Sequence, residues 1–176
     1  TGASDDEAYT TVPTSVTFPG YQPVYGGKGA INGFVAVAAG FDHSLALNAD
    51  GKVWAWGGNA SGQLGDGETE DRAQPKIIPD LHDIRAIAAG DGFSLALDSS
   101  GVVWAWGNNV LGQLGDGTRV GKFKPVKVAR LEGAQGIVAG GAHAMAVLAD
   151  GSLWTWGNNS FGQLGEGNII NLVPVP

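Results

Sequence analysis

An internal repeat of fifty residues is the feature of this sequence that most restricts its fold. The tetrapeptide at 54–57, Trp-Ala-Trp-Gly, recurs at 104–107 and, with threonine for alanine, at 154–157, a spacing of 50 residues each time. The glycine-rich run at 62–67 recurs in the same register in both later copies. A repeat of this period predicts an array of similar units that bury their apolar faces against one another.

Each repeat carries the alternating pattern of short β-strands. In the first copy, 44–47 and 53–56 alternate on either side of Asp50-Gly51, a pair typical of tight hairpins because such turns need positive φ. A first strand is expected before each hairpin and a fourth after each glycine-rich loop, at 34–39, 84–89 and 135–139 and at 76–78, 126–128 and 172–175 respectively. No segment has a sustained apolar period of 3.6 residues, so we expect an all-β protein with essentially no helix.

Four short antiparallel strands in each repeat predict a blade of a β-propeller. The chain then contains three blades, at about 23–74, 75–124 and 125–176, after an N-terminal arm or linker at 1–22. The segment 22–24 aligns with the fourth strand of a blade whose other strands are absent. Since propellers typically have about four to eight blades, we expect either part of a longer ring or a ring closed by self-association. Six blades from two chains are the simplest closed form.

Composition narrows the possible functions. The 176 residues include no cysteine, and 10 basic side chains stand against 17 acidic ones, a formal net charge of -7. The absence of cysteine excludes a disulfide framework and a cysteine-ligated metal. The acidic balance argues against nucleic acid as a partner, because neutralising phosphates needs a basic surface. No apolar run approaches the roughly 18 residues of a membrane span, so we expect no membrane partner.

The motif Trp-Gly-x-Asn-x-x-Gly-Gln-Leu-Gly-[Asp/Glu]-Gly, present three times, resembles the repeat of the regulator of chromosome condensation family. The runs Gly-x-x-His-Ser-Leu-Ala-Leu at 40–47 and Asp-Gly-x-Val-x-x-Trp-Gly at 50–57 extend the resemblance, which covers about residues 23–176. Kelch repeats have a similar period but lack this motif. The resemblance implies a β-propeller.

Residues that recur in every copy are interpreted as structural, because a catalytic constellation would break the symmetry of the repeat. The tryptophans are expected to pack between blades, and the glutamines to tie the long loops to backbone groups: Trp54, Trp56, Trp104, Trp106, Trp154, Trp156, Gln63, Gln113 and Gln163. Phe93 occupies the position of His43 and His143, so this position is interpreted as a packing position.

The sequence contains no recognisable catalytic or metal-binding constellation. It has neither a nucleophile elbow nor a His-Glu-x-x-His motif, so we predict no enzyme activity, no catalytic residues and no cofactor. Four acids crowd the loop at 66–71 but match no EF-hand spacing, so we interpret this loop as solvated and predict no metal site. The tripeptides at 59–61 and 158–160 have the form of glycosylation sequons.

Binding is expected on the face that carries the long loops. In an up-and-down blade, the loops between the first and second strands and those between the third and fourth strands lie on the same face. Half of the basic residues, five of 10, follow the second glycine-rich loop and include Arg119, Lys122 and Lys124. A secreted bacterial member of the resembled family inhibits β-lactamase with residues that precede the second strand, which implies partner-binding roles for Phe41, Asp42 and Asp91.

The leading hypothesis is therefore a non-enzymatic protein-interaction scaffold whose protein partner is unknown. The alternative is a carbohydrate- or cell-wall-binding accessory module of a larger extracellular protein, since the start at 9–14 resembles a linker in composition. The localisation is left open, with a secreted or cell-surface bacterial protein favoured over a cytoplasmic one. The exposed ends of a three-blade array favour self-association.

Overall fold

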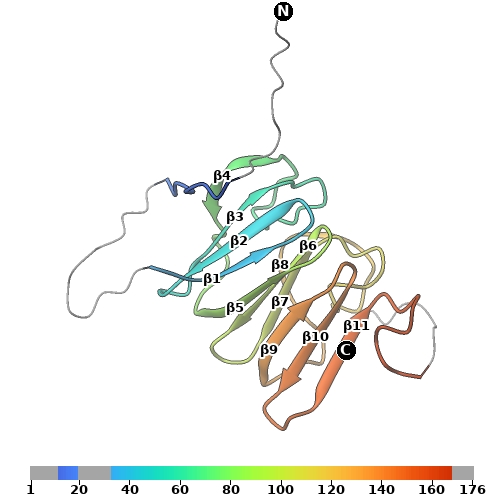
Figure 1. Cartoon of the computed structure of the whole chain (residues 1–176). Coiled ribbons are helices and arrows are strands. Elements are labelled where there is room, and N and C mark those ends of the chain that lie inside the picture. Colours follow the sequence, from blue (N-terminus) through green and yellow to red (C-terminus); the bar gives the residue numbers. More distant parts are fainter. Residues whose placement is uncertain (1–11, 20–32, 168–176) are drawn as a thin grey trace, which may run out of the picture.

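The computed structural model describes residues 12–19 and 33–167, which contain eleven strands and, within those ranges, no helix (Figure 1). The strands form three antiparallel sheets that follow one another in chain order. The prediction of an all-β fold with three propeller blades is confirmed. In the described part of the chain, no helix is long and apolar enough to cross a bilayer.

The first two sheets have four strands each, and the third has three. Blade 1 contains β1 (Phe34–Ala39), β2 (His43–Asn48), β3 (Val53–Gly57) and β4 (Arg72–Ile77), hydrogen-bonded in that order. Blade 2 repeats the order with β5 (Ile84–Ala89), β6 (Phe93–Asp98), β7 (Val103–Gly107) and β8 (Lys122–Lys127). Blade 3 consists of β9 (Ala134–Ala139), β10 (His143–Leu148) and β11 (Leu153–Gly157).

The fourth strands begin earlier than the sequence predicts. β4 starts at Arg72, which pairs with Gly57, and β8 starts at Lys122, which pairs with Gly107. The predicted starts at 76 and 126 were therefore wrong by four residues. Pro75 lies inside β4 because an edge strand tolerates a residue that lacks an N–H donor. The fourth strand predicted at 172–175 and the leftover strand at 22–24 lie outside the described residues.

The hairpin between β2 and β3 turns at the Asp50-Gly51 pair. Gly51 has a φ of +72°, whereas Asp50 does not have positive φ, so a primed turn with two such residues is excluded. The backbone N–H of Asn48 donates to the carbonyl of Lys52, which closes a three-residue loop around the turn. The predicted hairpin is therefore present, and only the glycine of the Asp-Gly pair has positive φ in its turn.

The hydrophobic core lies between the blades rather than within them. Leu45, Leu47 and Val53 of blade 1 are at most 1% exposed and share one cluster with Ala96 and Trp106 of blade 2. The matching residues of blade 2 form a second cluster with the corresponding residues of blade 3, which include Ala146 and Trp156. Each interface therefore places the leucine face of one blade against the tryptophan face of the next.

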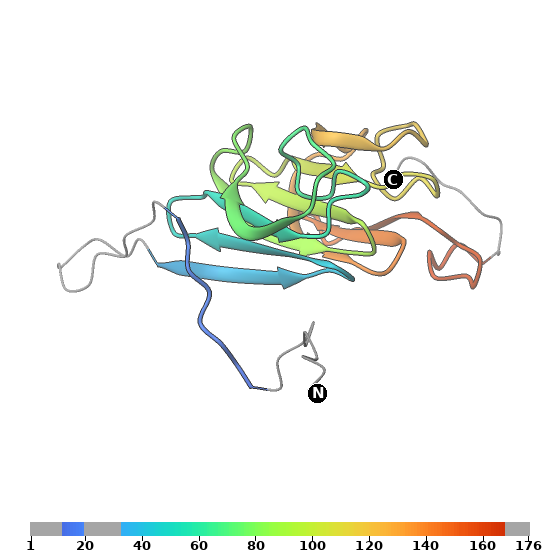
Figure 2. The ribbon, with the colours of Figure 1, turned by 90° about the horizontal axis from the view of Figure 1, so that it is seen from above.

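The N-terminal segment 12–19 covers the free side of blade 1 (Figures 1 and 2). The ring of Phe18 lies 4.1 Å from that of Phe34, and it meets Trp54 and Trp56 edge-on at 6.2 and 5.7 Å. The described part of the predicted arm is therefore packed against the tryptophan face of blade 1.

Candidate functional site

Three short loops at 40–42, 90–92 and 140–142 join the first and second strands of the blades, and backbone hydrogen bonds link each loop to the next. The N–H of Phe41 donates to Gly90 O at 3.3 Å, and that of Asp91 donates to Gly141 O at 2.8 Å. A side chain at Gly90 would place its Cβ 2.6 Å from Gly140 O, so the close approach of the loops requires glycine there. The three loops form one continuous, fixed edge.

The long loops begin beside these short loops. The N–H groups of Gly58, Asn108 and Asn158 donate to the carbonyls of Asp42, Gly92 and Ala142 at 2.7, 2.7 and 2.9 Å. Both sets of loops therefore lie on one face of the blades, as the alternation of strands predicts. We call this surface the loop face and define it by the residues 40–42, 58–61, 90–92, 108–111, 140–142 and 158–161.

One buried asparagine in each blade organises the long loop. Asn59, Asn109 and Asn159 are fully buried, and each Oδ1 accepts a hydrogen bond of 3.0 Å from the N–H of the leucine five residues later. The Nδ2 of Asn59 donates to Glu68 O at 3.1 Å, so both polar atoms of this side chain hold the long loop in the folded protein. The recurrence of asparagine two residues after Trp-Gly was the signal that pointed to this role.

The recurring glutamines and tryptophans connect the loop face to the blade interfaces. The Oε1 atoms of Gln63, Gln113 and Gln163 each accept a 2.9 Å hydrogen bond from the N–H two residues earlier. The backbone carbonyl of Gln63 accepts from Trp106 Nε1 at 2.8 Å, and that of Gln113 accepts from Trp156 Nε1 at 3.0 Å. The indole of each of these blades is thus tied to the long loop of the preceding one.

Of the other indoles, Trp104 Nε1 donates to Asp98 Oδ2 at 3.0 Å, and Trp154 Nε1 meets Ser152 Oγ at 3.1 Å. Both of these partners belong to the hairpin end of the same blade. These tryptophans therefore support the hairpins, on the side away from the loop face.

His43 takes part in a hydrogen-bonded chain between blades 1 and 2. Its Nε2 donates to Ser94 Oγ at 2.8 Å, and Ser94 donates to Gln63 O at 2.8 Å. Its buried Nδ1 has no hydrogen bond and lies 3.6 Å from Asp42 Oδ1. Burial lowers the pKa of His43 below 6.5 although the charge of Asp42 acts to raise it, so the imidazole is neutral at neutral pH.

The loop face exposes aromatic and acidic side chains. Phe41, one of the predicted binding residues, is 84% exposed, and the predicted residues Asp42 and Asp91 lie in exposed positions of the same row of loops. Asp42 also accepts a hydrogen bond from Gln63 Nε2 at 3.1 Å, so it has a structural contact as well. Phe161, which is 90% exposed, was not singled out from the sequence. Its signal is that this position varies between copies inside an otherwise constant motif.

The predicted basic residues lie at the outer edge of the molecule. Lys122 and Lys124 belong to β8, the outermost strand of blade 2, and Arg119 lies in the loop that leads to it. Lys122 Nζ is 3.5 Å from Asp116 Oδ2, and Lys124 Nζ is 3.6 Å from Asp80 Oδ2. Lys122 and Lys124 are therefore paired with acids beside the edge strand, apart from the row of loops that contains Phe41.

The acidic loop is organised by ion pairs. Asp66 Oδ2 contacts Arg72 Nη2 at 2.6 Å and Lys76 Nζ at 3.2 Å. Burial alone would raise the pKa of Asp66, but hydrogen bonds from the Glu68 backbone and from both cations lower it. Among the residues that the structure describes, no three His, Cys, Asp or Glu side chains are placed to hold a metal ion together.

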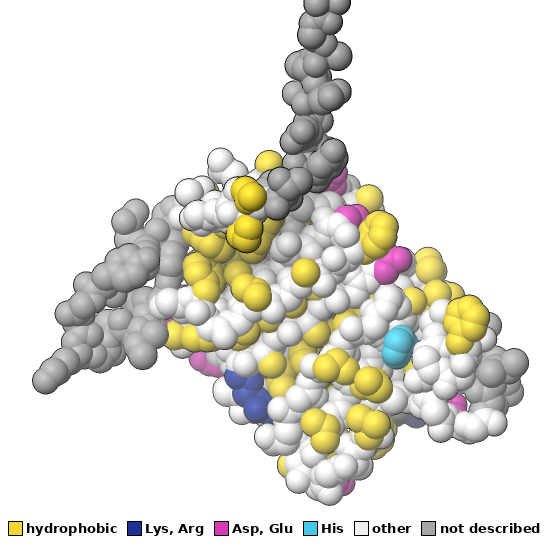
Figure 3. Space-filling model, in the orientation of Figure 1, with side chains coloured by type: hydrophobic (Ala, Val, Ile, Leu, Met, Phe, Trp, Pro, Cys, Tyr) yellow, Lys and Arg dark blue, Asp and Glu magenta, His cyan; other side chains and the backbone are white. Residues whose placement is uncertain are grey.

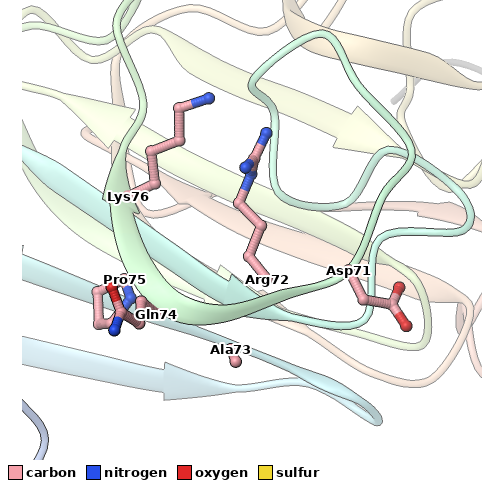
Figure 4. Close-up of a pocket in the computed structure, with 6 residues that line it drawn as sticks. All are labelled: Asp71, Arg72, Ala73, Gln74, Pro75 and Lys76. Carbon is pink, nitrogen blue, oxygen red and sulfur yellow. The ribbon is translucent and has the colours of Figure 1, made fainter.

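An open hollow of about 490 Å³ runs along β4 beside this ion-paired group (Figure 4). Its lining comes from residues 71–76 alone, and Figure 4 shows Arg72 and Lys76 projecting from the same side of the strand. Because both cations are held by Asp66, we assign the hollow no binding role.

Comparison with known proteins identifies the repeat. A family model described as "Regulator of chromosome condensation (RCC1) repeat" matches residues 34–63, 84–113 and 135–163, and a second model with the same description matches 50–97 and 100–147. The ultraviolet-B receptor UVR8 of Arabidopsis thaliana is 42% identical over 69 residues, which are 39% of this chain and 13% of the receptor. Human RCC2 is 46% identical over 39 residues, 22% of this chain and 8% of that protein.

Solved structures agree with these matches. Prp20p of Saccharomyces cerevisiae superposes with a TM-score of 0.73 at 28% identity, and human WBSCR16 with a TM-score of 0.72 at 27% identity. Each match covers 81% of this chain and 37% of the solved one. The chain thus spans less than half the length of these relatives.

Proposed function

Because this chain belongs to the regulator of chromosome condensation repeat family, we propose that it is a protein-binding module that takes its partner on the loop face. Propeller repeats of this family are typical of protein-interaction scaffolds and of exchange-factor-like regulators. The yeast protein Prp20 has been crystallised with Kap60 bound, and its own structure is described with binding to Gsp1p and histones. These partners are proteins, which favours a protein ligand here.

The observation that carries the proposal is the exposure of two aromatic rings on loops that are fixed by hydrogen bonds. Phe41 is 84% exposed and Phe161 is 90% exposed, and both belong to the loop face. Val110, in the corresponding loop of blade 2, is 64% exposed. An aromatic ring that is held ready on a rigid loop loses little entropy when a partner covers it, and such rings carry much of the energy of protein interfaces.

The charge of the loop face indicates the chemistry of the partner. Asp42 and Asp91 stand in the same row of loops as Phe41, whereas the basic residues of blade 2 lie at the rim. Charges at the rim of an interface guide association and suppress wrong partners. The proposed ligand is therefore a protein segment that combines apolar side chains with lysine or arginine.

Binding without catalysis accounts for the ionisable groups described above. His43 is hydrogen-bonded between blades, and Asp66 and Asp116 are paired with the cations that begin the following strands β4 and β8, Arg72 and Lys122. Each of these groups stabilises the fold and leaves the loop face to present apolar and acidic side chains. We therefore propose a non-enzymatic role.

A display library of random peptides tests the proposal, with the purified protein as bait. We expect the selected peptides to contain aromatic or aliphatic residues next to lysine or arginine. Their affinity should fall by about tenfold or more for the double variant Phe41→Ala/Phe161→Ala, in line with the loss of interface anchors. Asp91→Asn should weaken binding most at low salt, because screening already reduces its contribution at high salt.

The matched control is Ser99→Ala, an exposed change in the hairpin at the opposite end of blade 2. Peptides that bind the double variant as tightly as the original protein, or that lose affinity with Ser99→Ala, would contradict the assignment of the loop face. Binding to a glycan array that disappears with the double variant would favour the carbohydrate-binding alternative.

A further inference from the structure

The far side of blade 3 is an apolar sheet face that has no neighbour among residues 12–19 and 33–167. Val138, Met145, Val147 and Leu153 line a shallow hollow of about 260 Å³ together with adjoining small and aliphatic residues of β9 and β10. Leu153 is 66% exposed and Val147 is 40% exposed. Figure 3 shows hydrophobic side chains gathered over this end of the molecule, where β9, β10 and β11 lie.

The same positions are completely covered in the other two blades. Leu47 and Val53 of blade 1, which correspond to Val147 and Leu153, are 1% and 0% exposed, and their counterparts in blade 2 are 0% exposed. In both cases the cover is the tryptophan face of the following blade, as with Trp106. The far side of blade 3 is therefore a leucine face that lacks its tryptophan face.

At the other end of the array, the tryptophan face of blade 1 lacks the leucine face of a preceding blade among the described residues. Trp56 corresponds to Trp106 and Trp156, which are fully buried by a preceding blade, but Trp56 itself is only partly buried. Phe18 lies against it and against Trp54, at the place where a preceding blade would supply leucines. The arm thus acts as a substitute for a neighbouring blade.

We propose that the far side of blade 3 binds the tryptophan face of blade 1 of a second copy of this chain, which displaces the Phe18 arm of that copy. The contact would repeat an interface that the chain already forms twice, and it would bury the exposed surfaces of Val147 and Leu153 under indole. This surface is distinct from the loop face and does not depend on the function proposed for it.

Backbone groups support the same arrangement. Between blades 2 and 3, Asp91 N donates to Gly141 O and Ala134 N donates to Gly101 O. By repeat equivalence, Gly141 N of one copy would face Phe41 O of the next, and Gly151 O would face Phe34 N. Two copies of the three described blades, joined head to tail at both ends, would close into a ring of six blades that leaves neither apolar end face exposed.

Sedimentation velocity of the intact chain over a range of micromolar concentrations tests the proposal. We expect concentration-dependent association from a monomer of 17.9 kDa towards twice that mass. If the arm covers the tryptophan face about nine-tenths of the time, Phe18→Ala should strengthen each contact by about tenfold, because a competing occupant lowers the apparent affinity by the fraction of free face. The closed ring has two such contacts, so its formation should be strengthened by about a hundredfold. Leu153→Lys should abolish association, since the contact would bury its charge.

Val120→Lys is the matched control, because Val120 is 64% exposed in a long loop away from both end faces and should leave association unchanged. Thermal melts show that each variant is folded. The proposal is overturned if Leu153→Lys associates like the original chain, or if Phe18→Ala remains monomeric throughout. Weaker association of Phe18→Ala would also overturn it, because the occupant of the open face would then be the arm of the second copy.

Discussion

Truncation of Trp106 measures how strongly two blades are held together. The indole is completely buried at the interface of blades 1 and 2, and its Nε1 donates to Gln63 O at 2.8 Å. Loss of a buried tryptophan side chain costs about 3–5 kcal/mol, part of it for the cavity that remains. The lost hydrogen bond adds only about 1 kcal/mol, because Gln63 O keeps its bond from Ser94 Oγ and is not left unpaired.

Trp106→Ala should therefore lower the free energy of unfolding by about 4–6 kcal/mol, a large share of the roughly 5–15 kcal/mol of an average domain. Trp56→Ala, at the same position of blade 1 but only partly buried beside Phe18, should cost about 1–2 kcal/mol. Urea titration followed by circular dichroism at a concentration where the chain is monomeric gives both values. If the costs of Trp106→Ala and Trp56→Ala agree within about 1 kcal/mol, the argument from the buried cavity is refuted. Packing between blades would then not be what holds the array together.

Three further outcomes follow from single side chains. Because the pKa of His43 is lowered in the folded protein, the unfolded chain takes up the proton first, so the free energy of unfolding should fall as the pH drops below 6.5. Thermal melts at several pH values should show that His43→Phe loses part of this pH dependence. Asn109→Ala should cost about 1–3 kcal/mol by removing the acceptor for Leu114 N, whereas Asn158→Ala, at a partly exposed position, should cost less in the same urea titration. Phe41→Ala should leave the melting temperature unchanged within about 2 °C, because its ring is 84% exposed and packs little, and scanning calorimetry measures this.

The repeating pattern predicted the blades well because the residues that recur are the ones that every interface needs. The first three strands of each blade followed from apolar alternation to within one residue at each end: β2 and β9 begin one residue earlier than the pattern predicts, and β2 and β3 end one residue later. The fourth strands did not follow, because β4 and β8 are edge strands with mixed, mostly exposed side chains. Such strands are defined by backbone pairing, as between Gly57 and Arg72, which side-chain patterns do not record.

The candidate site was harder to predict for the opposite reason. Residues that recur in every copy form the structural framework of the blades, whereas exposed binding residues lie where the copies differ, as at Phe161. Contacts between residues far apart in the sequence could not be predicted either. Neither the stacking of Phe18 on Phe34 nor the bond between His43 and Ser94 can be inferred from local spacing, since each depends on how separate segments meet in space.

The location of the apolar clusters between sheets has a consequence for biosynthesis. A single blade has no hydrophobic core of its own, because Leu45 and Leu47 are buried from solvent only when Ala96 and Trp106 of the next blade pack against them. A nascent chain must therefore extend about fifty residues beyond β2 before these leucines can be buried by blade 2, since neighbouring repeats fold together. At roughly 5–20 residues per second, the ribosome leaves these leucines exposed for a few seconds, during which chaperones have access to them.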